Sequence, residues 1–534
     1  MGRRRDGPIG GKAATPLTYG MATGHHPRET SGGEHPTRKK WVLISMSLAF
    51  TMTMIDATIV TVALPSIQRD LALTNTERVW VVNAYLLAYT VFVAAAGKFA
   101  DRFGQRRLFV LGLLTFTAAS IAAGLATGAT MLIIARALEG LGGAMMTPTS
   151  QAIVTAAYPK DERGRALGIY AGVSALGVAL GPLLGGLLTT FAGWEWIFFV
   201  NVPVGAATLA LTRYANPAQD RAPDSEPIDW TGLAALVLGL SCFTIAIMES
   251  GTWGLGSPAF LATISLGLVL LLAFVWFELR KEYPLLRLRI FENRDFAADN
   301  IVNFFVRFAL FGLSVYGPIF VQDVLGFSAF EAGAATLPAT VMLFLVAPRS
   351  GKAYDRIGAR PLLWSGSLTV AAGFIWLSAV LHLQSYLWMV PAYIIAGVGV
   401  GLIMSPALTD AMNAAPADQR GQAAGIVGTV QQLGGTMGTA IVTAVLTPLF
   451  VDKLAASLGT TTQAVQTALA QSQGGSLPST VSPQAITAAK EAFASSLAVA
   501  YLIVVAVMVL SFIIAFFLHS KSRPTSPSGP TVIA

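Results

Sequence analysis

The chain has 534 residues, of which 54% are hydrophobic and only 12% are charged. Ordinary soluble domains carry roughly 25% charged residues, so this composition excludes a soluble globular enzyme, a disordered chain and a nucleic-acid-binding module. A membrane-spanning helix needs about 20 apolar residues, and the apolar content suffices for about a dozen spans or slightly more. The net charge of +7 is therefore interpreted through membrane topology rather than through an acidic partner.

Fourteen apolar runs in the chain are long enough to cross a bilayer. An even number of spans places both ends of the chain on the same side of the membrane. The expected spans, in chain order, are 41–64, 79–100, 107–127, 130–156, 165–190, 196–214, 230–249, 258–278, 297–321, 331–350, 361–382, 387–412, 420–448 and 493–518.

The Lys and Arg residues sort strongly between the two sides of the expected membrane. Residues 1–40 carry eight of them and no apolar core of signal-peptide length, so we expect a disordered cytoplasmic N-terminal tail. With the N-terminus inside, 29 Lys and Arg residues lie in the tails and even-numbered loops, against four in the odd-numbered loops. The positive-inside rule then places both termini, including a C-terminal tail at 519–534, in the cytoplasm. The richness in Ala and Gly suits a bacterium, so we expect a bacterial inner-membrane protein.

Two polar segments interrupt the pattern of spans. Residues 449–492 are rich in Ala, Thr, Ser and Gln and are too polar to span, so we expect an extracellular loop. Residues 215–229 hold three prolines and several acids and are interpreted as a linker. The expected organisation is a six-helix bundle at 41–214, a linker with two inserted helices at 215–296, and a second six-helix bundle at 297–518.

Two pairs of short segments indicate an internal repeat. Gly97–Gly104 resembles Gly351–Gly358 at an offset of 254 residues, and Pro159–Gly164 resembles Pro416–Gly421 at an offset of 257. Each match crosses eight expected helices and returns to the same side of the membrane. The pattern predicts two parallel halves of six helices with two helices inserted between them, and a substrate site between the halves near the bilayer midplane.

Four motifs together carry a resemblance to a known family. They are the Gly97–Arg107 loop, Arg136–Gly142 in the fourth span, a glycine-proline run in the fifth span, and Ile55–Pro65 in the first. As a set they resemble the fourteen-helix drug:proton antiporters of the major facilitator superfamily, the EmrB/QacA type, over residues 41–518. The resemblance implies an all-α membrane protein with the major facilitator fold, in which two six-helix bundles and two inserted helices give 14 transmembrane helices.

The resemblance assigns proton coupling to charged residues inside the spans. Asp56 lies 15 residues past Trp41, about 22 Å along a helix and deep in the hydrocarbon. Arg136 and Glu139 are three residues apart and share a helix face. Asp56 either exchanges a proton or only balances Arg136 as a structural ion pair, and we favour exchange. Glu139 either neutralises Arg136 or adds a second titratable carboxylate, and the sequence leaves these alternatives open.

The repeated loop is expected to act as a conformational latch. Asp101 has the chemistry to pair with nearby arginines or to cap the N-terminus of a neighbouring helix. The expected latch residues are Gly97, Asp101, Arg102, Gly104, Arg106 and Arg107, with Gly351, Asp355 and Arg356 in the second copy.

The fifth span carries the glycine-proline motif that the superfamily associates with antiporters. Small residues allow close backbone packing, and a proline removes one helical hydrogen bond. The motif residues are Gly177, Gly181, Pro182 and Gly185. The segment Trp194–Pro203, which is also typical of this family, is expected to anchor the sixth span at the interface, and no chemistry is assigned to it.

Polar and methionine side chains in the spans are candidates for substrate binding. Arg307 either lines the cavity or snorkels towards the inner face, and the amides either bind substrate or bond across helices. Methionines are able to form a pliable cavity wall, but core packing is the more common role. The candidates are Asn83, Tyr85, Tyr89, Met145, Met146, Arg307, Gln431 and Gln432. Asp410, near the inner end of its span, is expected to be interfacial.

Motifs of other chemistries are absent from the sequence. There is no G-x-x-x-x-G-K-[ST] phosphate loop, no G-x-S-x-G elbow and no H-E-x-x-H pair. The single cysteine, Cys242, excludes a disulfide framework and a cysteine metal site. None of the five histidines is placed for metal binding or catalysis within the membrane; they are His25, His26, His35, His382 and His519. We therefore expect no enzyme activity, no cofactor, no metal and no nucleic-acid partner.

The sequence favours a proton-coupled exporter of hydrophobic or amphiphilic drugs that works by alternating access. Its expected partners are the lipid bilayer, protons and a small substrate, and we expect a monomer. One alternative is export of an endogenous metabolite, lipid or siderophore. An alternative of another class is a non-transporting membrane receptor built on the same fold.

Overall fold

The computed structural model of the protein describes residues 36–217, 229–249, 253–254, 256–416, 419–471 and 482–519. Within these ranges the secondary structure is helical and no β-strand occurs. Fourteen of the described helical segments are long and apolar enough to cross a membrane, which confirms the predicted all-α fold and the number of spans. Residues 1–35 of the expected N-terminal tail, 218–228 of the expected linker, and the C-terminal tail beyond His519 lie outside the described residues.

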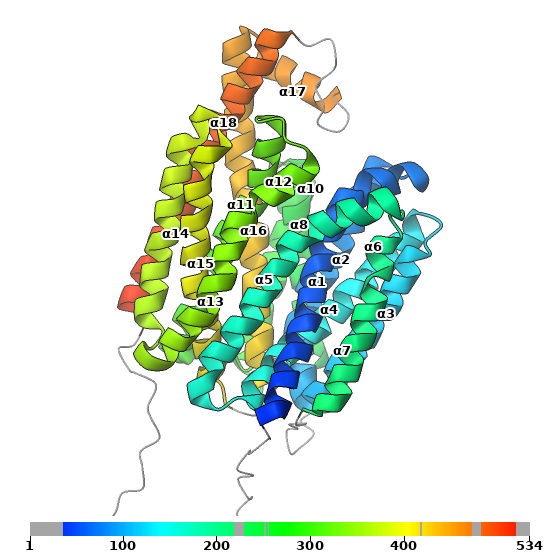
Figure 1. Ribbon diagram of the computed structural model, residues 1–534, viewed down its shortest axis with the longest axis vertical. Helices are drawn as coiled ribbons and strands as arrows, with labels where there is room; N and C mark the ends of the chain where they lie inside the picture. The colour runs from blue at the N-terminus through cyan, green and yellow to red at the C-terminus, as the bar shows by residue number, and fades with distance from the viewer. Residues whose placement is uncertain are drawn as a thin grey trace, which may run out of the picture.

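The first six spans form one group of helices, coloured blue to green-cyan in Figure 1. Helix α1 begins five residues inside the expected tail, and the sixth span is built from a short helix followed by a longer one. The bounds are α1 (Pro36–Asp70), α2 (Asn75–Phe103), α3 (Gln105–Gly124), α4 (Ala129–Ala157), α5 (Lys160–Phe191), α6 (Trp196–Phe199) and α7 (Asn201–Ala215).

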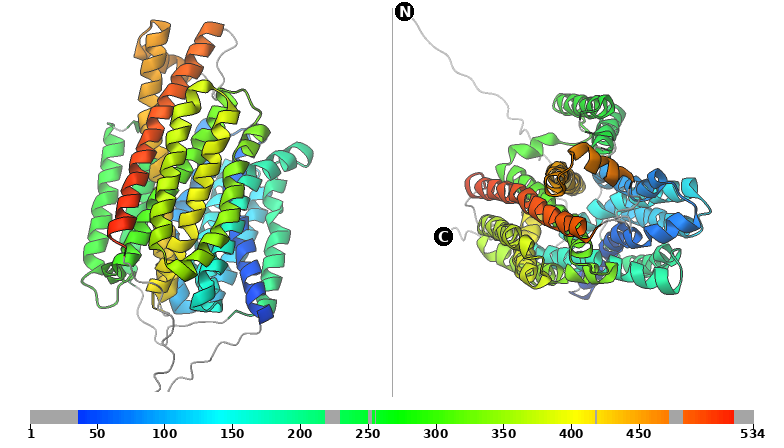
Figure 2. Two further views of the ribbon diagram at one scale, coloured as in Figure 1. Left: turned by 60° about the vertical axis from the view of Figure 1, so that its left-hand side comes forward. Right: turned by 90° about the horizontal axis from the view of Figure 1, so that it is seen from above.

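Two helices stand outside this group as a hairpin, α8 (Trp230–Met248) and α10 (Pro258–Glu278), and the right-hand view of Figure 2 shows them apart from both bundles. Helix α8 contacts α10, α2 and α16. Lys281 Nζ donates to Asp229 Oδ1 at 2.6 Å and ties the base of the hairpin together. Burial by itself raises the pKa of Asp229, but hydrogen bonds from the Gly232 N–H and from Lys281 outweigh it and lower the pKa to about 2.

The last six spans form the second group, green to red in Figure 1. A short 3-10 helix, η1 (Leu288–Glu292), precedes this group, and a second one, η2 (Leu381–Leu383), extends the eleventh span. The α-helices are α11 (Arg294–Asp323), α12 (Ala329–Ala335), α13 (Leu337–Ile357), α14 (Arg360–Val380), α15 (Tyr386–Ala414), α16 (Arg420–Leu458), α17 (Thr462–Gln471) and α18 (Pro483–Phe517).

The polar segment 449–492 is more regular than a loop. Helix α16 continues to Leu458, α17 follows it, and α18 already begins at Pro483, while 472–481 lie outside the described residues. Val451, Leu454 and Val465 belong to a small apolar cluster that holds these helices together. Polarity excludes a membrane span here, but Ala and Gln are good helix formers, so the described part of this connection between spans is mostly helical.

The two groups of helices meet along two equivalent seams. One seam joins α2 to α16 and the other joins α5 to α13. Helices α2 and α13 carry the two copies of the Gly-Lys loop motif, and α5 and α16 begin within the Pro159–Gly164 and Pro416–Gly421 motifs. Each copy of one repeat motif therefore lies against a copy of the other repeat in the opposite bundle. We call the end of the molecule where α1 begins and α18 ends, lowermost in Figure 1, the basal end.

Close packing at glycine holds α16 against α11 inside the second bundle. A Cβ atom at Gly438 would overlap the carbonyl oxygen of Phe308 and would lie 2.7 Å from its Cα. Gly434 makes the same approach to Phe304, one helical turn away. Backbone atoms cannot move aside as side chains do, so the two glycines set the distance between these helices.

We expect Gly438→Ala to lower the thermal melting temperature of the purified protein by several degrees, because overpacking typically costs about 1–3 kcal/mol. Gly186→Ala is the matched control, since its Cβ would meet only Val62 Cγ1 at 3.9 Å. The measurement is a detergent-solubilised melt followed by tryptophan fluorescence. Equal melting temperatures for the two variants would contradict the packing argument.

Candidate functional site

Four helices of the first bundle bring polar side chains to one buried cluster. Arg136 Nη1 on α4 donates to Asp56 Oδ2 on α1 at 2.7 Å and to Glu139 Oε2 at 2.6 Å. Asn201 Nδ2 on α7 donates to Asp56 Oδ1 at 3.0 Å and to Ser120 Oγ on α3 at 3.1 Å. Ser120 Oγ donates in turn to Glu139 Oε1 at 2.6 Å. Every carboxylate oxygen of the cluster therefore has a donor.

The cluster is closed off from solvent in this conformation. Asp56, Arg136 and Glu139 are each 0% exposed. The guanidinium lies 4.6 Å from the centre of the Tyr85 ring and 5.8 Å from that of Phe198, so two aromatic faces cover it. Its Nε donates to the backbone carbonyl of Val81 at 3.2 Å. These hydrogen bonds and ring contacts hold the Arg136 side chain in one orientation.

The charges of the cluster do not balance when both acids are ionised. Two carboxylates share one guanidinium, and among the described residues no other Lys, Arg or His forms an ion pair with Asp56 or Glu139. A net charge inside a dry helical bundle is costly, by several kcal/mol per ion. Binding of one proton makes the cluster neutral. The arrangement is therefore chemically suited to take up and release a single proton.

The structure brings together the three residues expected for proton coupling and adds two that the sequence did not reveal. Asn201 belongs to a segment to which no chemistry was assigned, yet it binds Asp56 directly. No sequence pattern pointed to Ser120, which binds Glu139 and Asn201. A signal existed for Asn201, since it is a lone amide in an apolar helix start, but its partner lies 145 residues away in the chain.

The three candidates on α2 lie in different environments. The Tyr85 ring covers Arg136, and its hydroxyl donates to the Thr53 carbonyl at 3.2 Å, so Tyr85 is part of the buried cluster. Tyr89 donates from its hydroxyl to Thr147 Oγ1 at 3.0 Å. Asn83 is half-buried, and its side chain forms no hydrogen bond with the described residues.

Met145 and Met146 lie in the packed interior between α3 and α4. Met146 is 1% exposed and belongs to the apolar core of the first bundle. A Cβ at Gly112 of α3 would lie 2.8 Å from Met145 Cβ and 3.1 Å from Met146 Cγ. Neither methionine is therefore included in the substrate region proposed below.

Arg307 lies on α11 and is half-buried. Its Nη2 donates to Gln431 Oε1 on α16 at 3.1 Å, and Gln431 Nε2 donates to Asn303 Oδ1 at 3.1 Å. Arg307 is within electrostatic range of Tyr89 and Tyr170 of the opposite bundle. Gln431 thus bonds across helices, which was one of the two alternatives. Gln432 is half-buried, and the described residues provide no hydrogen-bond partner for its side chain.

Asp101 spans the seam between the bundles at the basal end. Its Oδ1 accepts the Gly421 N–H and its Oδ2 accepts the Gln422 N–H, both at 2.8 Å, at the start of α16. Of the two expected alternatives, the geometry shows the helix cap. Gly97 allows this approach, because a Cβ there would overlap the Gly421 carbonyl oxygen.

The second copy of the motif repeats the arrangement with the bundles exchanged. Asp355 Oδ1 on α13 accepts the Gly164 N–H of α5 at 3.2 Å, and Gly351 packs directly on the Gly164 backbone. The turns that follow are also alike, with φ +97° at Gly104 and φ +79° at Gly358, values that favour glycine. The two halves therefore cap each other reciprocally.

The arginines of the two loops lie around these caps and not in them. Arg102 stacks over the Phe103 ring at 5.6 Å, and Arg106 donates to Asn216 Oδ1. Arg107 and Arg356 are exposed.

The glycine-proline motif packs α5 against α1. Cβ atoms at Gly177 and Gly185 would lie 2.9 and 2.6 Å from the carbonyl oxygens of Thr51 and Ile59, and one at Gly181 would overlap the Thr58 hydroxyl. Pro182 Cβ lies 3.4 Å from the position of a Cβ at Gly333, on α12 of the other bundle. The motif thus places α5 close to the helix that carries Asp56.

Comparisons with known proteins agree with this architecture. The sequence model of the Major Facilitator Superfamily matches residues 46–439, more than half of the chain. The multidrug resistance protein Stp of Mycobacterium tuberculosis is 35% identical over 407 residues, which cover 76% of this chain and 75% of the relative. The tetracenomycin C resistance and export protein of Streptomyces glaucescens is 32% identical over 402 residues, 75% of this chain and 74% of the relative.

Solved structures show likeness of the fold alone. The proton:xylose symporter XylE, solved with a bound deoxyglucose derivative, superposes with a TM-score of 0.57 at 13% identity. The match covers 87% of this chain and 95% of that chain.

We expect Arg136→Gln to destabilise the protein by about 3–5 kcal/mol at pH 8, because two buried carboxylates lose the guanidinium that pairs with both of them. The loss should be smaller at pH 5, where protons neutralise the acids more readily. Glu139→Gln should melt close to the parent protein, since Arg136 and Asp56 then form a neutral pair. The measurement is a thermal melt in detergent at both pH values. A pH-independent loss in Arg136→Gln would contradict the charge argument.

Proposed function

Because the chain belongs to the major facilitator superfamily, a family of membrane transporters and not of enzymes, we propose that it is a drug exporter that exchanges protons for its substrate by alternating access. Relatives named for multidrug resistance and for tetracenomycin C export support hydrophobic or amphiphilic drugs as substrates. The basic residues at the basal end support a cytoplasmic location of that end.

The observation that carries proton coupling is the unbalanced buried cluster. Asp56 and Glu139 share Arg136 as their one cationic partner among the described residues. We assign the exchanging proton to Asp56, because its other oxygen is held only by the neutral amide of Asn201. Glu139 keeps a short bond from Ser120 and stays with Arg136 on the same helix. A proton on Asp56 weakens its link to Arg136 and so loosens α1 from α4.

Access to Asp56 has to alternate between the two sides of the membrane. The cluster is closed in the conformation described, so exchange occurs in conformations in which α1, α4 and α7 separate on one side or the other. Helix α1 packs on α5, which forms a seam with α13 of the opposite bundle. A displacement of α1 that follows a change at Asp56 therefore reaches the α5–α13 seam through α5.

The latch is the second part of the mechanism. With Asp101 and Asp355 both capping helices of the opposite bundle, the basal ends are held together and the cytoplasmic side is closed. Opening towards the cytoplasm breaks both caps, and hydrogen bonds of this charged kind contribute about 1.5–3 kcal/mol each. The two copies thus set the relative stability of the two conformations.

We place the substrate between the bundles, in contact with Tyr89 on one side and with Arg307 and Gln431 on the other. Tyr89 and Arg307, from opposite bundles, lie within electrostatic range of each other. Asn83 and Gln432 remain candidates, because both are half-buried with no hydrogen-bond partner among the described residues.

The proton gradient is sufficient to drive such export. One elementary charge crossing ~100 mV supplies about 2.3 kcal/mol, and one pH unit adds about 1.36 kcal/mol. Their sum of about 3.7 kcal/mol sustains roughly a 500-fold gradient of a neutral substrate at one-to-one exchange.

We expect Asp56→Asn to abolish transport driven by a pH gradient while substrate binding persists, because an amide cannot exchange the proton. Inside-out proteoliposomes containing the parent protein should accumulate at least one of tetracenomycin C, puromycin and rhodamine 6G when acidified internally. The Asp56→Asn protein should accumulate at least tenfold less, yet bind the same compound in a fluorescence titration.

The matched control for this prediction is Glu139→Gln, which alters the other carboxylate of the same cluster. It should retain transport within a few-fold of the parent protein. Unchanged gradient-driven transport by Asp56→Asn would refute its role, and loss in Glu139→Gln alone would move the proton to Glu139.

We expect Asp101→Ala to increase the population that is open at the basal end by about tenfold or more, because two hydrogen bonds to a charged group are lost. Spin labels at Arg165 and Lys352, both exposed beside the α5–α13 seam, report the opening as a longer distance. Asp355→Ala should act in the same direction but less strongly, since the hydrogen bond from the Gly164 N–H to Asp355 is longer, at 3.2 Å, than the two bonds to Asp101.

Asp161→Ala is the control for the latch, because Asp161 is an exposed acid at the same end with no ion pair among the described residues. Cys242 is replaced by Ser in all labelled proteins. The same distance distribution in Asp101→Ala and Asp161→Ala would show that Asp101 does not hold the bundles together.

A further inference from the structure

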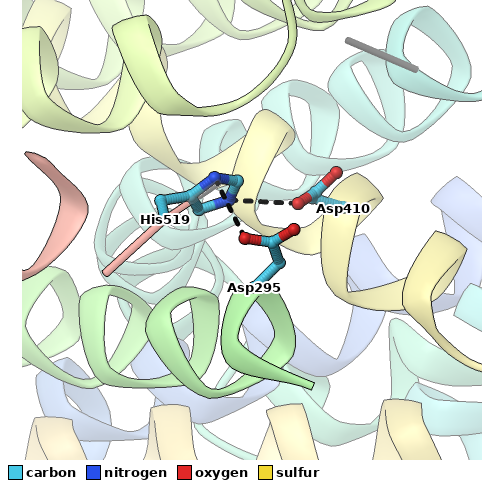
Figure 3. Close-up of side chains that lie close together, drawn as sticks. All are labelled: Asp295, Asp410 and His519. Atoms are coloured by element: carbon cyan, nitrogen blue, oxygen red, sulfur yellow. Dashed lines mark ion pairs between the residues drawn. The ribbon is translucent and has the colours of Figure 1, made fainter. Parts of the chain in front are cut away.

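A second charged cluster lies at the basal end of the second bundle, away from the proton cluster. His519 follows the end of α18, Asp295 and Asp299 lie in the first turns of α11, and Asp410 lies near the end of α15. Figure 3 shows His519 beside Asp295 and Asp410, with an ion pair from its ring to each carboxylate. One ligand atom from each of these three residues lies within 4.8 Å of the others.

The spacing around His519 Nε2 fits metal ligands as well as an ion pair. Nε2 lies 3.1 Å from Asp410 Oδ2 and 3.4 Å from Asp299 Oδ1. Charge-assisted hydrogen bonds are shorter, about 2.7–2.9 Å. A tetrahedral Zn²⁺ with bonds of about 2.0–2.2 Å holds neighbouring ligand atoms about 3.3–3.6 Å apart. The separations at His519 fit the edges of such a tetrahedron with little adjustment.

Asp299 gives an independent indication of a cation. The residue is 0% exposed, and neither of its carboxylate oxygens accepts a hydrogen bond from the described residues. Buried carboxylates are normally paired or bound to a metal, because a desolvated charge is costly. Of the described residues, His519 alone forms an ion pair with Asp299. The Asp299 carboxylate oxygens therefore have unused acceptor capacity beside the His519 ring.

Neighbouring side chains orient the proposed ligands, as hydrogen-bonding groups around the ligands of a metal site do. Asp295 Oδ1 lies 3.5 Å from Nδ1, the other ring nitrogen of His519. The Tyr354 hydroxyl donates to Asp410 Oδ1 at 2.6 Å and accepts from Asn413 Nδ2 at 3.1 Å, which leaves Asp410 Oδ2 for the site. Carboxylate support of the histidine and fixed orientation of the ligating acid are both present.

We propose that His519, Asp299 and Asp410 bind a divalent transition-metal ion, Zn²⁺ by geometry, with Asp295 orienting the histidine ring. An imidazole and two carboxylates with a water in the fourth position suit Zn²⁺ better than Mg²⁺, which prefers oxygen ligands in an octahedral site. The bound ion offsets the charges of Asp299 and Asp410. It also fastens the end of α18 to α11 and α15.

The site is linked to the seam between the bundles. Asn413 Oδ1 accepts from Arg163 Nη1 on α5 at 2.8 Å, so a chain of hydrogen bonds runs from Asp410 through Tyr354 and Asn413 to the first bundle. Metal binding is thus positioned to stabilise the conformation that is closed at the basal end. The metal site itself does not depend on the proposed proton coupling.

The test is calorimetric titration of Zn²⁺ into the full-length protein in detergent, purified without a polyhistidine tag and treated with chelator. His25, His26 and His35 are replaced by Ala in every protein, so that they add no binding. We expect one Zn²⁺ per chain in this parent protein. The affinity should fall by about 10–100-fold in Asp299→Asn and in His519→Gln, and should stay unchanged in the control His382→Gln, an exposed histidine on η2.

Absence of Zn²⁺ binding to the parent protein, or equal affinity in Asp299→Asn and the parent, would overturn the proposal and leave an imidazolium ion pair as the function of the cluster. X-ray absorption of the zinc-loaded parent protein gives a second readout that needs no variant. One imidazole with oxygen ligands at about 2.0–2.2 Å supports the site, and a spectrum with several imidazoles contradicts it.

Discussion

A charge buried in a dry helical bundle is costly unless an opposite charge pairs with it. This constraint determines how the buried charged residues of the protein are arranged. In the first bundle, two carboxylates depend on the guanidinium of Arg136, which is itself covered by aromatic faces. Because these side chains are closed off from solvent, the proton exchange that we propose requires a change in how α1, α4 and α7 pack. The same constraint makes these residues important to the stability of the first bundle.

Because of the internal repeat, the same helix-capping interaction occurs twice between the two bundles. A carboxylate at the end of one helix caps a helix of the opposite bundle, and the second copy does the same in reverse. Glycine at Gly97 and Gly164 lets backbones meet at those points. Two equivalent caps break together when the bundles separate, so the basal end is expected to open in one step and not gradually.

The inserted hairpin and the charged cluster near His519 fall outside this scheme. Helix α8 contacts both bundles, through α2 of the first and α16 of the second, while α10 contacts mainly α8. His519 forms ion pairs with Asp299 on α11 and Asp410 on α15. Hydrogen bonds through Tyr354 and Asn413 connect Asp410 to Arg163 of the first bundle. The hairpin is inserted between the two six-helix bundles, and the cluster near His519 lies at the basal end of the second bundle, away from Asp56, Arg136 and Glu139.

The sequence alone determined the membrane class, the number of spans, the repeat and the family, because hydrophobic run length and charge sorting are local properties that every span reports separately. It also identified Asp56, Arg136 and Glu139. It did not identify Asn201 or Ser120 as their partners, nor the grouping of Asp299, Asp410 and His519. Such clusters join residues far apart in the chain, and only helix packing decides which polar side chains share a buried space and which, like Met146, are enclosed in apolar surroundings.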